Sequence, residues 1–362
     1  MPDSLSSWFR LTLVPGIGGQ TQRKLLRAFS SPDAVFSASR SAVSAIIGEK
    51  NAVLLLETDN REAIQKAMQW AEGEGQHVLT LADAAYPQRL LQTPDPPSLL
   101  YVRGRLDVLN LPTLAIVGSR NPTPQGLQNA EAFASHLAGA GLAIASGMAL
   151  GIDAAAHRGA LLAHGKTIAF VGTGIDRVYP ARNHALALEI GEKGAIVSEF
   201  PLGTPATAAN FPRRNRLISG IAQGVLVVEA AVESGSLITA RLAAEQGREV
   251  FSIPGSIHST QSRGCHKLIK QGAKLVETAQ DILEELAWTD SLIPVATPPD
   301  FSEKSFSEKD EVLEAMGFEP CTLDELATRS ALSVDELGVQ LLRLELEGKI
   351  AGVAGGRYQR LK

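Results

Sequence analysis

Ala115-Ile116-Val117-Gly118-Ser119-Arg120 is an apolar run that ends in glycine and opens into a helix-like pattern. Ala169-Phe170-Val171-Gly172-Thr173-Gly174 has the same form, and Glu233-Ser234-Gly235-Ser236-Leu237-Ile238-Thr239 follows a third apolar run. In a parallel α/β sheet, the carboxyl ends of the strands and the helix N-termini after them form the ligand crevice. Those N-termini present unpaired N–H groups and a partial positive charge. The three segments therefore predict a sheet edge that binds phosphate.

Residues 111–288 alternate strand-like and helix-like patterns, as βαβ units do. The strand-like segments are short, apolar and rich in β-branched residues, which suits strands that are buried on both faces. We therefore predict an α/β fold with a doubly wound, mostly parallel sheet. The expected strands are Leu114–Val117, Leu142–Ala145, Thr167–Val171, Ala195–Ser198, Val225–Val228, Glu249–Ser252 and a short one near Lys274–Val276.

An arginine cluster lies between the second and third glycine-rich segments. Asn210-Phe211-Pro212-Arg213-Arg214-Asn215-Arg216 places three arginines within four positions. Loops that are suited to phosphate, together with this cluster, indicate a polyphosphate ligand. That ligand is either a nucleotide or a nucleic-acid backbone.

The composition sets the class of protein. A chain of 362 residues predicts two or three domains, and 44% hydrophobic with 20% charged residues is typical of a soluble globular protein. No apolar stretch reaches the ~18 residues that cross a bilayer. The first residues, 1–5, have neither the basic region nor the apolar core of a signal peptide, so we expect a cytoplasmic protein.

The charge distribution is informative although the net charge is only −5. Residues 111–288 hold 15 Lys and Arg against 14 Asp and Glu, whereas residues 300–362 hold 8 against 13. The acidity is concentrated in the C-terminal piece. The glycine-rich region is close to neutral and can still present a basic face to a nucleic acid.

The two cysteines, Cys265 and Cys321, fall in different predicted domains, so we expect reduced thiols and no disulfide. Cys265 and His266, with His258 upstream, provide too few ligands for a zinc site. No Cys-x-x-Cys or His-x-x-x-His pair completes a tetrahedral set, and we predict no metal.

The N-terminal region, residues 1–62, reads as a helical domain. Pro15-Gly16-Ile17-Gly18 precedes a helix-like stretch and resembles a helix-hairpin-helix turn, which aims backbone amides at a DNA phosphate. An ordinary turn between two packed helices explains the same four residues equally well. Residues 63–110 form a connector whose strand-like pieces, His77–Thr80 and Leu99–Gly104, are expected to extend one edge of the main sheet.

Residues 289–308 have the composition of a linker, and residues 309–362 have a winged-helix pattern. Thr322 with Glu325, and Ser333 with Glu336, predict capping boxes at two helix starts. Residues 348–353 and 356–359 predict a two-stranded wing. The expected recognition helix holds four carboxylates and one cation, Arg343. A major-groove helix is usually richer in Arg, Lys, Asn and Gln, so we favour a protein-contact or regulatory role over sequence-specific DNA binding.

Motifs for nucleotide enzymes are incomplete. Gly172-x-Gly174 lacks the third glycine of a dinucleotide fingerprint, where Arg177 stands, and the chain has no P-loop and no Gly-x-Ser-x-Gly elbow. Asp153 and His157 are spaced i, i+4, a geometry that serves either catalysis or packing, and packing is the simpler interpretation. No coherent pair of nucleophile and base is evident, and we predict that the protein is not an enzyme.

Seven motifs in a fixed order resemble the DNA-processing protein A family (DprA, also called Smf). The resemblance covers about 180 residues of the chain. The motifs are Val117-Gly118-Ser119-Arg120, Ser146-Gly147-x-Ala149-x-Gly151-Ile152-Asp153-x-x-Ala156-His157, Gly172-Thr173-Gly174-Ile175-Asp176-x-x-Tyr179-Pro180, Phe211-Pro212-x-Arg214-Asn215-Arg216, Ser234-Gly235-Ser236-Leu237-Ile238-Thr239-Ala240, Ile253-Pro254-Gly255-Ser256 and Gly264-Cys265-His266-x-Leu268-Ile269.

The resemblance implies an extended Rossmann-like sheet, a homodimer and no catalytic activity or cofactor. It implies a protein that binds single-stranded DNA, protects the incoming strand in natural transformation and loads the RecA recombinase past single-strand-binding protein. A charged groove that follows the DNA backbone agrees with loops and arginines that lack a catalytic set. Two alternatives are open. One is a Rossmann-like nucleoside monophosphate hydrolase, although the glutamate that such an enzyme uses is absent after Thr239 in this sequence. The other is a winged-helix transcription factor.

The resemblance also assigns a DNA-binding site by position. Arg120, Arg214 and Arg216 would contact phosphates, with Asn215 beside them; an internal ion pair of Arg214 or Arg216 with Glu199 or Glu229 is the alternative. Two lysines of the family are replaced by Ala181 and Ala208, and Arg182 and Arg213 are expected to compensate. The expected dimer face lies near Ala244 and Ile269. Amides and hydroxyls for the strand would come from Gly118, Ser119, Gly147, Gly172, Gly174, Ser236 and Thr239.

Overall fold

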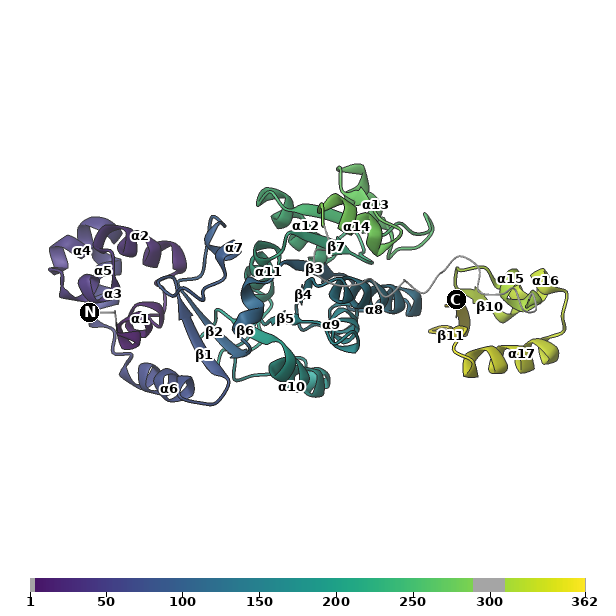
Figure 1. Ribbon diagram of the computed structural model, residues 1–362, viewed down its shortest axis with the longest axis horizontal. Helices are drawn as coiled ribbons and strands as arrows, with labels where there is room; N and C mark the ends of the chain where they lie inside the picture. Colours follow the sequence, from purple (N-terminus) through teal and green to yellow (C-terminus); the bar gives the residue numbers. More distant parts are fainter. Residues whose placement is uncertain (1–3, 289–309, 362) are drawn as a thin grey trace.

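A nine-stranded sheet dominates the computed structural model, which describes residues 4–288 and 310–361 (Figure 1). The six pairs from β6 to β9 across the sheet are parallel, and β1 and β2 add to one edge in antiparallel fashion, so the prediction of a mostly parallel sheet is confirmed. In spatial order the strands are β1 (Gln76–Thr80), β2 (Leu99–Gly104), β6 (Ala195–Ser198), β5 (Thr167–Phe170), β4 (Ala143–Ser146), β3 (Thr113–Val117), β7 (Gly224–Val227), β8 (Glu249–Ser252) and β9 (Lys274–Leu275).

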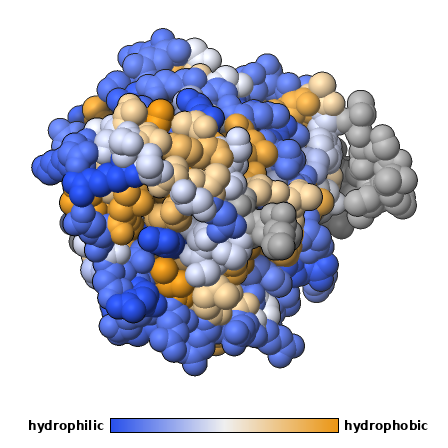
Figure 2. Space-filling model, turned by 90° about the vertical axis from the view of Figure 1, so that its left-hand side faces the viewer, coloured by the Kyte–Doolittle hydropathy of each residue, from blue (hydrophilic) through white to orange (hydrophobic). Residues whose placement is uncertain are grey.

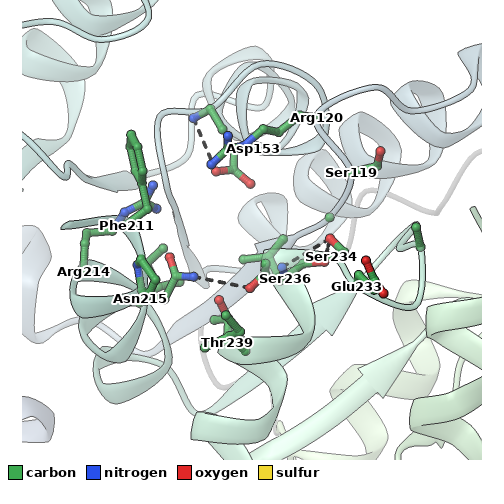
Figure 3. A pocket seen from close by; sticks show the side chains of 18 of the residues that line it. Ser119, Arg120, Asp153, Phe211, Arg214, Asn215, Glu233, Ser234, Ser236 and Thr239 are labelled. Carbon is green, nitrogen blue, oxygen red and sulfur yellow. Dashed lines mark hydrogen bonds between the residues drawn. The ribbon is translucent and has the colours of Figure 1, made fainter. Parts of the chain in front are cut away.

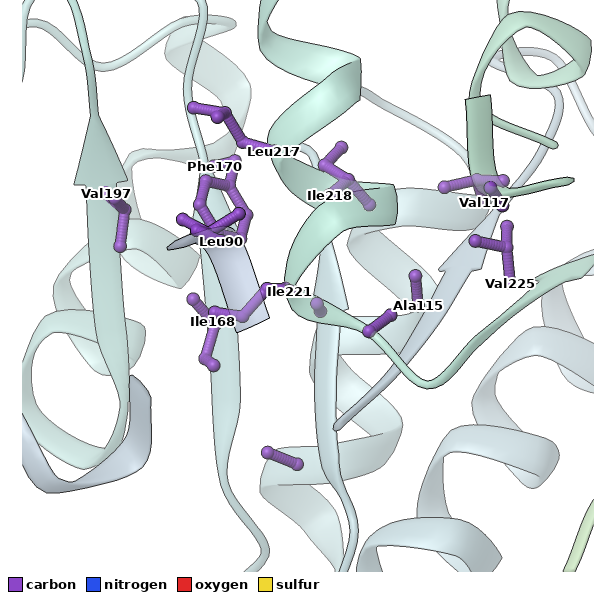
Figure 4. Close-up of a cluster of buried hydrophobic side chains, with 14 of the residues drawn as sticks. Leu90, Ala115, Val117, Ile168, Phe170, Val197, Leu217, Ile218, Ile221 and Val225 are labelled. Carbon is purple, nitrogen blue, oxygen red and sulfur yellow. The ribbon is translucent and has the colours of Figure 1, made fainter. Parts of the chain in front are cut away.

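Helices cover both faces of this sheet because alternate side chains of each strand point to opposite sides. Ala115 and Val117 of β3 face the layer that contains α11 (Asn210–Ile221), as Figure 4 shows. Leu114 and Ile116 pack into the opposite layer. The first layer is α7 (Gln88–Leu91), α11, α12 (Gly235–Glu245) and α13 (Arg263–Lys270); the second is α8 (Pro124–Gly139), α9 (Ile152–Leu162) and α14 (Ala279–Glu285); α10 (His184–Lys193) packs near β6.

The direction of strand addition reverses at β3. From β3 the chain adds β4, β5 and β6 on one side, and it then returns to add β7, β8 and β9 on the other side. The loops that leave β3 and β7 therefore run apart, although the two strands are paired from Leu114 with Gly224 to Val117 with Val227. This point is where open α/β sheets bind ligands.

The N-terminal helices form a bundle with a core of its own, made by Leu11, Leu25, Val35, Val43 and Leu55 among others. The end of the molecule that they form has a mostly hydrophilic surface with small hydrophobic patches (Figure 2). The helices are α1 (Leu5–Thr12), α2 (Gly19–Phe29), α3 (Pro32–Ser37), α4 (Arg40–Ile47), α5 (Glu49–Glu57) and α6 (Arg61–Ala71). The domain boundary at residues 62 and 63 stays a prediction.

The C-terminal residues form a winged helix, and both predicted capping boxes are present. Leu326, Leu337, Leu341 and Leu344 build its core. The wing pairs with a short third strand that the sequence did not indicate. The elements are α15 (Glu311–Met316), β10 (Cys321–Thr322), α16 (Leu323–Ser330), α17 (Val334–Leu346), β11 (Ile350–Val353) and β12 (Arg357–Arg360). The predicted linker, residues 289–308, lies outside the described residues.

Both cysteines are buried and unpaired. Among the helices of residues 4–288 and 310–361, none has the length and apolar character that crossing a bilayer requires.

Candidate nucleic-acid interface

A cleft of about 770 Å³ opens at the carboxyl ends of β3 and β7, and we refer to it as the main cleft (Figure 3). The loop after β3 forms one wall, α11 forms another, and the start of α12 with the loop before it forms the third. Seven of the predicted site residues line it: Gly118, Ser119, Arg120, Arg214, Asn215, Ser236 and Thr239. A side pocket of about 240 Å³ shares Arg120, Phe211 and Arg214 with the main cleft and adds Gly172.

The helical period of α11 divides the arginine cluster between two surfaces. Residues that are three or four positions apart share a helix face, so Phe211, Arg214 and Asn215 all line the main cleft. Arg213 and Arg216 point instead toward a different cavity, beside Glu199. Arg213, Arg214 and Arg216 are close together in sequence, but they do not line one groove.

Arg214 is a buried cation that faces the main cleft. Only 5% of the residue is exposed, and its Nε atom has no hydrogen-bond partner in the described part of the chain. Burial lowers the pKa of Arg214, and the nearby carboxylate of Asp153 opposes that shift. Burial likewise raises the pKa of Asp153, against the effect of Arg214. Neither residue makes an ion pair with the other, so the guanidinium keeps donors for an anionic ligand.

Arg120 lies at the mouth of the main cleft among aromatic rings. Its guanidinium carbon is 5.2 Å from the centre of the Phe211 ring, and the Phe211 and Tyr179 rings are 6.0 Å apart. Tyr179 is 51% exposed. A cation beside exposed rings can hold a phosphate while a base stacks. Our sequence analysis did not assign Phe211 or Tyr179 to the site, although both belong to the motifs that carry arginine and glycine.

Most of the predicted backbone donors are used inside the protein. The Ser119 amide donates to the Glu229 carbonyl at 2.7 Å, and the Gly174 amide donates to the Thr204 carbonyl at 3.0 Å. The glycines allow close packing: a Cβ on Gly118 would lie 2.7 Å from Ile152, and one on Gly147 would overlap Arg214. These glycines thus shape the walls of the cleft.

The start of α12 is the most open source of backbone donors. Nothing lies within 4 Å of a Cβ placed on Gly235, and Ser234 caps the helix by accepting from the Ser236 amide at 3.3 Å. Thr239, one turn further along, lines the same wall. The positive end of the α12 dipole therefore faces the main cleft, although the exposed Glu233 carboxylate stands at its rim.

His157 has a structural position. Its Nε2 donates to the Gly147 carbonyl at 2.6 Å, and its Nδ1 lies 2.6 Å from the Thr167 hydroxyl oxygen, which in turn donates to the Ile144 carbonyl at 2.8 Å. Burial lowers the pKa of His157 to about 4. The Asn183 side chain holds the same loop by donating to the Met148 carbonyl at 2.9 Å. These contacts fix the loop that carries Gly147, which agrees with the packing interpretation of the Asp153 and His157 pair.

Other predicted residues lie away from the main cleft. Arg182 is exposed in a short 3-10 helix, η2 (Ala181–Asn183), which also contains Ala181. Arg216 makes ion pairs with Glu199 and Asp95, as in the alternative that the sequence left open, and its contact with DNA stays a prediction. Ala208 does line the main cleft, where the lysine of the family would add a charge. Ala244 is exposed and Ile269 is half-buried.

The cysteine and histidine motif after β8 has structural contacts. Cys265 is buried beneath β7, and the His266 Nε2 is 2.9 Å from the Gly255 carbonyl oxygen. Within the two described ranges, no three His, Cys, Asp or Glu side chains are grouped to hold a metal ion.

Comparison with protein families gives two matches. Residues 77–287 match the model of DNA recombination-mediator protein A, and residues 296–356 match that of the DprA winged helix domain. The chain is 41% identical to Protein Smf of Escherichia coli strain K12, over 98% of this chain and 95% of that protein. It is 47% identical to DNA processing protein DprA of Streptococcus pneumoniae, over 57% of this chain and 73% of the relative.

Two solved structures are similar to this one. The X-ray structure of DprA from Streptococcus pneumoniae has a TM-score of 0.70 at 38% identity, covering 78% of this chain and 98% of the other. The structure of DNA processing protein A from Helicobacter pylori, which describes the single-stranded DNA binding mode of that protein, has a TM-score of 0.53 at 32% identity. It covers 58% of this chain and 95% of the other.

Proposed function

The chain belongs to the DNA recombination-mediator protein A family, and on that premise we propose that it binds single-stranded DNA in the main cleft. The protein protects incoming DNA during natural transformation and loads RecA recombinase onto it. Its relatives named DprA are DNA processing proteins, and the Helicobacter pylori relative has a described single-stranded DNA binding mode.

One observation carries this proposal: two arginines and an aromatic pair meet where the sheet reverses its order. Arg214 is buried with unused donors, Arg120 is exposed, and both line the same cleft. A phosphodiester needs donors of this kind, and the positive end of α12 adds to the attraction. Contacts to phosphates carry no sequence information and stacking accepts any base, so we expect binding with little sequence preference.

The aromatic pair favours a single strand over a duplex. Phe211 and Tyr179 flank Arg120 at the mouth of the cleft, where an unstacked base can lie on a ring. Such stacking is worth about 1–3 kcal/mol per base, and it is open only to bases that are not already paired and stacked. A duplex would offer its phosphates alone.

The protein acts by binding, without making or breaking bonds and without a cofactor. The hydrolase alternative needs a carboxylate after Thr239, where Ala240 and Arg241 stand. His157, the nearest base in sequence to Asp153, has both ring nitrogens occupied away from the cleft. These features support a binding protein.

We propose a cytoplasmic homodimer whose partners include RecA and single-strand-binding protein. The dimer forms through the sheet near Ala244 and Ile269, which leaves the main cleft open to DNA because neither residue lines it. Light scattering is expected to give twice the chain mass of 38.3 kDa, and a monomer mass would contradict the dimer. The acidic winged helix contacts a protein, as the single cation of its recognition helix indicates.

The test is a fluorescence-anisotropy titration of labelled oligo-dT against a matched duplex at low and moderate salt. We expect tight, salt-dependent binding that favours the single strand. Equal affinity for both forms would remove the stacking argument. Failure to bind either form would shift the assignment to a nucleotide-sized ligand, to be followed by a hydrolysis screen with mononucleotides.

A further inference from the structure

A second cavity, of about 480 Å³, lies between the N-terminal helices and the edge of the sheet, and we refer to it as the α2 cavity. It is separate from the main cleft: no residue lines both. Its lining includes Gly18, Arg23, Ser98, Tyr101, Glu199 and Arg213. Its size is within the range of cavities that hold small molecules, about 300–1,000 Å³.

Three residues that line the α2 cavity each carry a buried polar atom without a hydrogen-bond partner in the described part of the chain. The atoms are the Tyr101 hydroxyl, the Ser98 hydroxyl and the Glu199 Oε1 atom. Tyr101 is 1% exposed and Ser98 is 3% exposed. Buried polar groups are nearly always paired, and an unpaired one is costly. All three residues line the same cavity, which favours a polar ligand there.

The N-terminus of α2 opens into the same cavity. Gly18 is the N-cap and has no side chain to satisfy the amides of the first turn. Nothing lies within 4 Å of a Cβ placed on Gly18, whereas one on Gly19 would lie 2.9 Å from the Arg23 guanidinium and 3.8 Å from the Asp95 carboxylate, so the helix start is open on the Gly18 side. This is the Pro15–Gly18 turn that resembles a helix-hairpin-helix motif, and the structure directs it toward the sheet. Free amides and the helix dipole favour an anion here.

The charges around the α2 cavity leave one cation in excess. Arg23, Arg213 and Arg216 face Asp95 and Glu199. Arg23 pairs with Asp95, and Arg216 bridges Asp95 and Glu199, so these four form a closed network. The Arg213 side chain is 61% exposed, and its nearest nitrogen is 4.0 Å from the Glu199 carboxylate. Its guanidinium lies over the Phe200 ring. It is the cation at the mouth that remains available for a ligand.

We propose that the α2 cavity binds a phosphorylated nucleotide. The phosphate lies between the first amides of α2 and the Arg213 guanidinium. The base and sugar reach inward, where the Ser98 and Tyr101 hydroxyls and the Glu199 Oε1 atom pair with their polar atoms. The nucleotide is either free or part of a DNA strand that leaves the main cleft along α11, on which Arg213 and Arg214 are neighbours.

The test is isothermal titration of the full-length protein with dAMP and with short and long oligo-dA. Tyr101→Phe and Ser98→Ala each remove one unpaired hydroxyl, so folding stability is expected to hold while ligand affinity falls by about three- to tenfold. Tyr86→Phe is the matched control: this buried tyrosine does not line the cavity, and its hydroxyl donates to the Pro97 carbonyl at 2.7 Å. It is expected to lower stability and to leave affinity unchanged.

The outcomes identify the source of the nucleotide. Weaker dAMP binding in Tyr101→Phe, with no change in Arg120→Ala, supports a free nucleotide. No dAMP binding, but a loss of affinity in Tyr101→Phe for long oligo-dA only, supports a continuing strand. If neither hydroxyl variant changes any affinity, the proposal is wrong. The main-cleft proposal is judged separately, by the response of short oligonucleotides to Arg120→Ala.

Discussion

Arg120 and Arg214 both carry a positive charge at the main cleft, but they differ in burial. Arg120 is exposed and lies over a ring, so its removal should leave the fold intact. Arg214 is buried beside Asp153, so its removal would also leave a buried carboxylate without compensation. Arg120 is therefore the cleaner probe of the proposed site.

We expect Arg120→Ala to weaken oligo-dT binding about tenfold, or about 1.4 kcal/mol, and to lower the salt slope by about 0.7, the share of one phosphate contact on a single strand. Anisotropy titrations at several salt concentrations measure both. Arg158→Ala is the matched control, because Arg158 is exposed on α9 and does not line the main cleft. Equal losses in the two variants would mean that only overall charge matters.

Phe211→Leu is expected to weaken oligo-dT binding by about 1–3 kcal/mol while leaving duplex binding nearly unchanged, because leucine keeps an apolar contact but offers no ring for a base. Paired anisotropy titrations with both forms of DNA measure this difference. Thermal unfolding of the variant checks that the packing of Phe211 against Gly172 survives. A parallel loss for duplex and single strand would contradict base stacking.

The burial of His157 predicts that stability falls in acid. Its pKa is about 4 in the fold against 6.5 for an unperturbed histidine, so between these values the unfolded chain binds more protons. Stability therefore falls as the pH drops from about 6.5 to 4, by about 3 kcal/mol in total and about 2 kcal/mol at pH 5. Buried carboxyls with raised pKa values, such as Glu229, act in the opposite direction.

Urea unfolding of the wild type and of His157→Gln at pH 7 and pH 5 isolates this contribution. Glutamine does not titrate, so the variant is expected to lose less stability than the wild type over that range. An equal loss in both proteins would show that His157 is not the group responsible.

At the residue scale the motifs picked out residues that share one cleft, while their contacts with DNA stay a prediction. The motifs identified Gly118, Arg120 and Arg214, which the structure brings together. The helical period of 3.6 residues per turn could have shown that the arginine cluster is divided between two faces of the helix. The unpaired Tyr101 hydroxyl could not have been predicted, because it depends on how distant segments pack.

At the scale of elements, the loop before α9 depends on one glycine. Gly151 has φ +83°, and a Cβ there would overlap the Ser119 carbonyl oxygen, which accepts from the Ile152 amide at 3.1 Å. This contact connects the start of α9 to the loop that carries Arg120. The position thus needs glycine for both its conformation and its space.

Gly151→Ala is expected to lower the free energy of unfolding by more than about 1 kcal/mol and to weaken oligo-dT binding, because the loop after β3 must shift. Gly235→Ala is the control, since its site is open and its φ is not positive. It is expected to change stability by less than about 1 kcal/mol. Denaturant unfolding compares the two; equal stability in both variants would contradict the role of Gly151.

The elements themselves were largely predictable. Buried parallel strands appear as short β-branched runs, and the capping boxes at Thr322 and Ser333 marked two helix starts. The short strand β10 was missed because two residues are too few to show the alternating pattern of a strand. It pairs with β12. The order of the strands was not predicted, since no local pattern encodes it.

At the scale of the whole molecule, the winged helix stands apart from the proposed DNA site. Every residue that lines the main cleft lies between Val117 and Gln261. The winged helix meets the sheet region at Gln359, whose Nε2 donates to Gln125 on α8 at 3.2 Å. We therefore expect that binding of DNA does not require residues 310–361.

Removal of residues 300–362 is expected to change oligo-dT affinity by less than about threefold, because the deleted piece is acidic and none of its described residues, 310–361, lines the cleft. Anisotropy of the truncated and full-length proteins at the same salt concentration measures this. A loss of tenfold or more would place the winged helix within the DNA site.

The most direct test of the central proposal is a crystal structure of the protein with a short oligo-dT. We predict that the strand lies across the carboxyl ends of β3 and β7, with phosphates within hydrogen-bond distance of Arg120 and Arg214 and a base on the Phe211 ring. A strand bound elsewhere, with the main cleft empty, would contradict the account.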